Sequence, residues 1–133
     1  MAFHEEYLDV LQNIEFSIVQ TYRENPQLHD FEVMRSLEAL IDFYVAEKIG
    51  RNPRSVSLSD RAQLVFDNVK NVSEWRVGRN PGLAENGERQ EFENSPTTID
   101  EMIKCLKKIL NSVQKWNKRG GRQGYLDFVS RYV

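Results

Sequence analysis

This chain of 133 residues contains little cysteine, proline or glycine, and it has no long hydrophobic run. Its single cysteine, Cys105, cannot form an internal disulfide, so a secreted, disulfide-stapled fold is not expected. No apolar stretch approaches the roughly 20 residues that span a bilayer. The acidic residues 1–6 also lack the basic head and apolar core of a signal peptide. We therefore expect a cytoplasmic protein that has no membrane partner.

The scarcity of helix-breaking residues leaves most of the chain free to form long regular segments, because only 4 prolines and 7 glycines occur. Hydrophobic residues make up 40% of the chain and charged residues 29%, which is typical of a globular protein and not of a disordered one. The length suits one domain covering residues 1–133.

Apolar residues recur every three or four positions in four separate stretches, which is the spacing of one buried face of an α-helix. The first stretch covers about residues 5–24 and ends at Asn25-Pro26, since proline cannot continue the helical hydrogen bonds. The second covers about residues 30–49, with Asp30 as a suitable N-cap and Gly50 suited to the left-handed position that ends a helix. Apolar side chains cover most of this second helix, so we expect it to be the central, most buried one.

The third stretch begins near Ser57–Asp60, whose spacing resembles a capping box, and its seam runs from Leu58 to Val72. Its valines would also suit a strand, but helical spacing over four turns favours a helix. The fourth begins at Thr98, with Glu101 three residues later as a second capping box, and carries an apolar stripe as far as Trp116. The segment of about residues 77–97 is polar and contains proline and glycine. Its composition predicts a long surface loop that is either functional or disordered.

The end of the chain predicts one more element. Glycines follow the fourth helix at positions 120, 121 and 124 and would permit a sharp reversal. The apolar residues from Tyr125 to Tyr132 then predict a short helix docked on the others. The sequence as a whole therefore predicts an all-α fold, an antiparallel four-helix bundle with a short C-terminal fifth helix.

Charge is distributed unevenly, because residues 1–103 hold 10 Lys and Arg against 19 Asp and Glu, whereas residues 104–133 hold 8 against one. Helical spacing places several of these cations on one side of the fourth helix and the turn after it, namely Lys104, Lys108, Lys115, Lys118, Arg119 and Arg122. Such a cluster suits the phosphates of RNA or DNA. The alternative is a solvated surface or a basic end paired with acidic helices of the same fold, which the net acidic charge favours.

A small acidic cluster lies on the polar stripe of the second helix, at Arg35, Glu38 and Asp42. Glu38 and Asp42 are one turn apart and could bind a cation, but Arg35 is their simpler partner in an ion pair at the edge of the core. Di-metal bundles use Glu-x-x-His pairs, and neither His4 nor His29 follows a glutamate by three. We therefore expect no cofactor and no metal site.

Other enzyme signals are weak. The spacing of Glu85, Glu88 and Glu91 is that of helical, magnesium-dependent pyrophosphohydrolases, but these residues fall in the predicted loop. Cys105 would need an activating neighbour to be a nucleophile, and a half-buried packing cysteine is the preferred interpretation, although the lysines around it could lower its pKa.

Two aromatic residues, Phe16 and Phe43, lie off the main stripes of their helices. Exposed together they would mark a partner or dimer surface, and the equal alternative is burial against the fifth helix. No motif is specific enough to name a family. We predict a non-catalytic protein-interaction or assembly module whose partner is another protein or a second copy. A nucleic-acid-binding protein that uses the basic fourth-helix face is the first alternative, and a metal-dependent nucleotide phosphohydrolase is the second.

Overall fold

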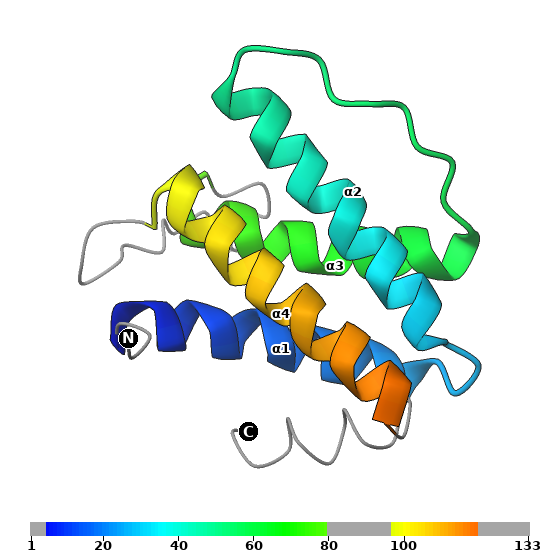
Figure 1. Ribbon diagram of the computed structural model, residues 1–133. Helices are drawn as coiled ribbons and strands as arrows, with labels where there is room; N and C mark the ends of the chain where they lie inside the picture. The colour runs from blue at the N-terminus through cyan, green and yellow to red at the C-terminus, as the bar shows by residue number, and fades with distance from the viewer. Residues whose placement is uncertain (1–4, 80–96, 120–133) are drawn as a thin grey trace, which may run out of the picture.

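A computed structural model describes residues 5–79 and 97–119 (Figure 1). Within these residues the chain forms four helices and no strand: α1 (Glu5–Glu24), α2 (Asp30–Lys48), α3 (Asp60–Arg76) and α4 (Ile99–Arg119). The predicted all-α class and the four long helices are confirmed. The predicted C-terminal fifth helix and nearly all of the predicted loop at 77–97 lie outside the described residues.

Two of the predicted helix starts shift by a residue or two. Asp30 is the first residue of α2 and not its N-cap, because the cap is His29, whose N–H donates to the Glu32 carboxylate at 3.0 Å. The Asp30 carboxylate instead accepts the hydroxyl of Tyr22 at 2.5 Å, which joins the ends of α1 and α2. The cap of α3 is Ser59 and not Ser57, and its hydroxyl accepts from the N–H of Ala62.

Two other helix ends are as predicted. Gly50 follows the C-cap of α2 with a φ of 70°, the left-handed geometry that glycine adopts without strain. At the start of α4 the hydroxyl of Thr98 accepts from the N–H of Glu101 at 3.1 Å. The Thr97 N–H also donates to the Arg76 carbonyl at 2.9 Å, so the two ends of the segment between α3 and α4 meet at its base.

The helices pack as two antiparallel pairs that cross each other in Figure 1. In one pair, Asp9 and Thr21 of α1 contact Arg76 and Asn68 of α3 respectively, so the two helices run in opposite directions. In the other pair, Lys48 at the end of α2 contacts Asp100 at the start of α4.

The pairing of α2 with α3 departs from the simple antiparallel expectation, since these neighbours run in the same direction. Ser59 bonds Glu32 at one end of the contact, and Tyr44 bonds Glu74 at the other. The reason is the connection of residues 49–59, whose eleven residues reach up to about 36 Å when extended, longer than the roughly 28 Å of α2 itself. The connection can therefore return along α2 before α3 begins.

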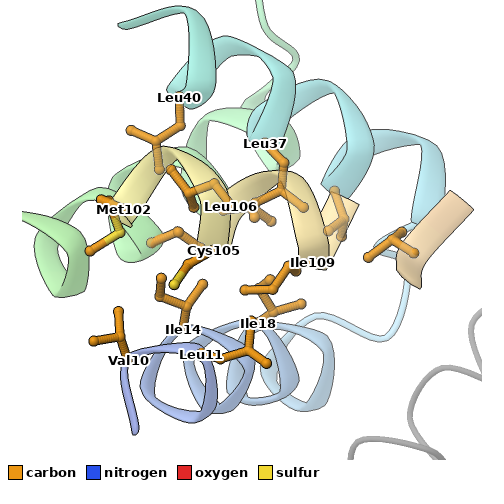
Figure 2. Close-up of a cluster of buried hydrophobic side chains, with 14 of the residues drawn as sticks. Val10, Leu11, Ile14, Ile18, Leu37, Leu40, Met102, Cys105, Leu106 and Ile109 are labelled. Atoms are coloured by element: carbon orange, nitrogen blue, oxygen red, sulfur yellow. The ribbon is translucent and has the colours of Figure 1, made fainter. Parts of the chain in front are cut away.

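The core lies where the two pairs meet (Figure 2). Its buried side chains come from all four helices, and the largest fully buried ones are Ile14, Ile18, Tyr22, Leu28, Leu37, Leu40, Tyr44, Met102, Leu106 and Ile109. Because the stripes of α1 and α4 are regular, each of these helices offers one buried face and one polar face. The helix α2 differs, and its remaining apolar surface defines the candidate site.

Candidate functional site

The helices α3 and α4 do not cover the whole apolar surface of α2. The helix packs against both α3 and α4, in keeping with its predicted central place, and it buries Val33, Leu37, Leu40 and Tyr44. Two of its apolar residues nevertheless remain highly exposed, Phe31 at 64% and the C-cap residue Ile49 at 61%. These two are 18 residues apart, which is five helical turns, so both face the same side of α2. The apolar circumference of α2 is thus not enclosed on every side.

A shallow groove of about 330 Å³ lies between α2 and α4 on the side of α2 that faces α4. Its apolar lining is Ile41 and Val45 from α2 and Leu110 from α4, all three only partly buried. Isolated apolar side chains are ordinary on protein surfaces, but a lined groove continuous with a partly apolar helix is typical of a contact surface. We call this surface the α2–α4 face: Ile41, Val45 and Leu110 with the flanking charges Glu38, Asp42 and Lys107.

The two rims of the α2–α4 face carry opposite charges. Glu38 and Asp42 line the α2 rim, and Lys107 lines the α4 rim. Asp42 is already partnered, since it accepts from the backbone N–H of Arg54 at 3.1 Å and lies 3.5 Å from the Arg51 guanidinium. Asp42 therefore fixes the returning connection to α2, and Glu38 is the exposed carboxylate of this rim.

The predicted acidic cluster is only partly assembled. Glu38 and Asp42 do border one groove, but Arg35 is exposed and lines a different, smaller groove of about 240 Å³, together with Phe31 and residues of the segment that leads into α3. Among the described contacts Asp42 is paired with Arg51 and not with Arg35. Within residues 5–79 and 97–119 there is also no group of three or more His, Cys, Asp or Glu side chains that could hold a metal ion.

The predicted basic face of α4 has the expected placement. Lys104, Lys108, Lys115 and Lys118 are all exposed, and helical spacing sets them on one side of the helix, away from the core stripe. Arg119 is the last residue of α4, with its side chain outside the description, and Arg122 lies outside the described residues altogether.

The two predicted aromatic residues do not form one patch. Phe16 on α1 is 43% exposed, whereas Phe43 on α2 is half-buried beneath Lys70, whose ammonium lies 4.5 Å from the ring centre. The ring of Phe43 also meets that of Tyr44 edge-on at 5.3 Å.

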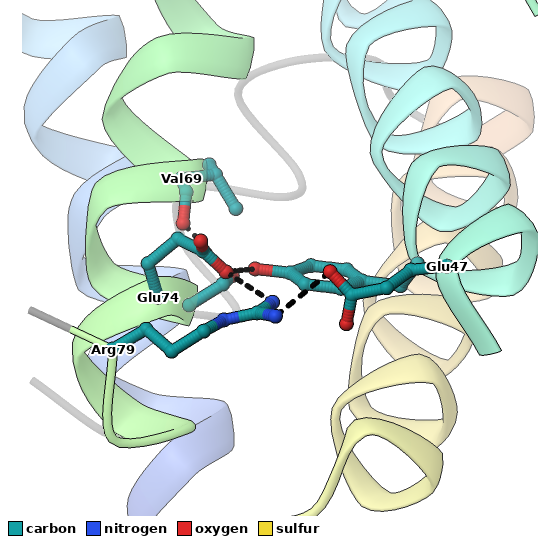
Figure 3. Close-up of polar contacts among 6 residues, drawn as sticks. Glu47, Val69, Glu74 and Arg79 are labelled. Carbon is teal, nitrogen blue, oxygen red and sulfur yellow. Dashed lines mark hydrogen bonds and ion pairs between the residues drawn. The ribbon is translucent and has the colours of Figure 1, made fainter. Parts of the chain in front are cut away.

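A polar network that helical periodicity does not predict joins α2 to the end of α3 (Figure 3). The hydroxyl of Tyr44 donates to the Glu74 carboxylate at 2.8 Å, and the Arg79 guanidinium lies 2.8 Å from both Glu74 and Glu47. Burial, followed by the hydrogen bond to Glu74, raises the pKa of Tyr44 far above its ordinary value. One guanidinium thus bridges two carboxylates and joins α2 to the end of α3 as a structural clamp.

Two buried ionisable groups have shifted pKa values. Burial raises the pKa of the Cys105 thiol to about 11, with the nearby charge of Glu101 adding to the rise, so the thiol stays protonated at neutral pH and the suggested lowering is wrong. Glu15 of α1 is only 6% exposed, and its burial raises the carboxyl pKa to about 7 against the opposing charge of Lys108. Glu15 follows Leu11 by four and precedes Ile18 by three, so its position in the apolar stripe was readable from the sequence.

Comparison with protein-family models, with curated proteins and with solved structures found no match. None of the described helices is both long enough and apolar enough to cross a bilayer.

Proposed function

We propose that this protein is a non-catalytic interaction module that binds a protein partner through the α2–α4 face. The observation that carries the proposal is the groove between α2 and α4, whose apolar lining residues Ile41, Val45 and Leu110 are only partly buried. Burying such side chains against a partner is favourable by roughly 25 cal/mol per Å² of apolar area. Opposite charges on the two rims supply specificity and orientation.

The chemistry of the described residues supports binding over catalysis. Cys105 is buried and protonated, which makes it a poor nucleophile. Asp42 is engaged by Arg51 and the backbone of Arg54, so it offers a cation fewer free oxygens. Glu15, whose carboxyl pKa is raised by burial, lies on α1 and does not line the α2–α4 groove.

The lysines of α4 favour a second candidate, a nucleic-acid-binding protein. Four exposed lysines, at positions 104, 108, 115 and 118, span 14 residues, or about 21 Å of helix, which is long enough to follow several phosphates. This candidate predicts steep weakening of binding with salt. It also predicts loss of binding on charge reversal at Lys115 and Lys118, two residues outside the α2–α4 face.

Site-specific photo-crosslinking in cells tests the proposed function. A photoreactive amino acid is placed at Glu38 on the rim of the groove, and the matched control places it at Asn71, an exposed position of α3. We expect crosslinks to protein from position 38 and few from position 71. Equal capture at both positions, or capture of nucleic acid in place of protein at position 38, would refute the assignment.

A further inference from the structure

We infer that the α2–α4 face binds a second copy of this chain, as a dimer whose twofold axis runs parallel to the two helices. The inference rests on the proposed function and names the partner for that face. Its basis is the arrangement of charge on the two rims of the groove. One orientation of the twofold axis brings the acidic rim of each copy opposite the basic rim of the other, and the other orientation brings like charges together.

The heights of the charges along the face follow from one contact. The Nζ atom of Lys48 lies 2.5 Å from the Oδ1 atom of Asp100, and α2 and α4 run in opposite directions from this contact. Seven residues back along α2 is Ile41, and seven residues on along α4 is Lys107, so these two lie level and line the same groove. Glu38 and Asp42 are therefore within one turn of the height of Lys107.

A twofold axis in the plane of the face has two natural orientations. If the axis is parallel to the helices, α2 of each copy faces α4 of the other at equal heights, so Lys107 of each copy meets Glu38 and Asp42 of the other. If the axis is perpendicular to the helices, α2 faces α2 and α4 faces α4, which sets acidic rim against acidic rim and lysines against lysines. Like charges in register are unfavourable, so the charges select the parallel axis.

The same arrangement also buries the apolar residues of the α2–α4 face of both copies. Ile41 and Val45 of each copy face the α4 side of the groove of the other, where Leu110 lies, and the four helices form an intermolecular bundle. The contact can extend at most along the whole of α2, about 28 Å, and across two packed helices, roughly 20 Å, so it covers no more than on the order of 500 Å² per copy. Stable dimers bury about 800 Å² per partner, so this dimer is expected to be weak and reversible.

Charge exchange between copies tests the inference with the full chain. Analytical ultracentrifugation of the wild-type chain, from micromolar to near-millimolar concentration, is expected to show a reversible monomer–dimer equilibrium. Glu38→Lys and Lys107→Glu should each weaken the dimer roughly tenfold or more, because each places like charges opposite each other at two symmetry-related points. An equimolar mixture of the two variants should associate again, since both contacts are then complementary.

The weakening of each variant and the recovery in the mixture decide together. Weaker association of each variant than of the wild-type chain, with recovery in the mixture, supports the parallel axis, because under the perpendicular axis the wild-type contacts already pair like charges and neither reversal adds repulsion. Variants that associate as the wild-type chain does, or a mixture that stays monomeric, overturn the parallel axis. Lys115→Glu is the matched control, a reversal on the same helix outside the groove, and it should leave the equilibrium unchanged. Thermal melts followed by circular dichroism verify that each variant is folded.

The outcome also separates this inference from the proposed function. A wild-type chain that remains monomeric at near-millimolar concentration, while position 38 crosslinks to a different protein, overturns the dimer and leaves the interaction module standing. A monomeric chain with no protein crosslink at position 38 overturns both.

Discussion

Removing the charge of Glu15 should stabilise the protein at neutral pH and not at acidic pH. The carboxylate is 6% exposed, and its pKa is raised by burial from an ordinary 4.5 to about 7. A group whose pKa is raised on folding favours the folded state below its unfolded pKa, and this contribution is lost as the pH rises through the folded value. The wild-type chain should therefore lose stability between pH 4.5 and about 7 on account of this residue.

The size of the effect follows from the same two pKa values. Each pKa unit corresponds to about 1.4 kcal/mol, so the difference between 4.5 and about 7 sets an upper limit of about 3 kcal/mol. Residual access of water to the carboxylate reduces this limit, and we expect Glu15→Gln to stabilise the chain by about 1–2 kcal/mol above pH 7. The gain should shrink toward zero as the pH falls to 4.5.

Urea unfolding at a series of pH values measures this difference directly, provided that the slope of the transition is the same for both proteins. Glu24→Gln is the control, because it removes an exposed carboxylate from the same helix. A Glu15→Gln variant that is no more stable than wild type at pH 8, or whose advantage does not change with pH, would refute the reasoning.

Three further substitutions test the packing. Tyr44→Phe removes the hydroxyl that donates to Glu74 and should cost about 1–2 kcal/mol in urea unfolding, with Glu74 still held by Arg79; an unchanged midpoint would contradict the clamp. Leu106→Ala opens a cavity at a fully buried position and should cost about 3 kcal/mol, and a loss below 1 kcal/mol would mean that the core is packed differently. Gly50→Ala should cost about 1 kcal/mol through its φ of 70° alone, since the added methyl group meets open space; a neutral result in thermal melts would place Gly50 in another conformation.

Helix periodicity was enough to predict the four helices and most of the core. The stripes of α1 and α4 match the buried residues closely, because a regular spacing of three and four leaves one face to bury. Local cap chemistry was less decisive: Ser57, Ser59 and Asp60 all suit the start of α3, and the structure uses Ser59. In the same way Asp30 suits an N-cap, but the Tyr22 hydroxyl engages it.

The candidate site was harder to predict, because it depends on which helices are neighbours. The sequence shows that α2 is apolar around most of its circumference, and burial on all sides was the natural expectation. Only the packing reveals that one side faces a groove, with Ile41 and Val45 beside Leu110 of α4. Likewise, Glu74 meets Tyr44 and Arg79 meets Glu47 only because the connection after α2 brings α3 back parallel to it. Contacts of that kind link residues about 30 positions apart and have no local signal.

The most direct test of the α2–α4 face is a concentration series of backbone amide NMR spectra of the wild-type chain. We predict that chemical shifts change with concentration at residues 38–45 of α2 and 103–110 of α4, and stay fixed around Phe16 and along the outer side of α3. Spectra that do not change up to near-millimolar concentration would contradict the second copy as partner. Changes centred on Phe16 would contradict the choice of the α2–α4 face itself.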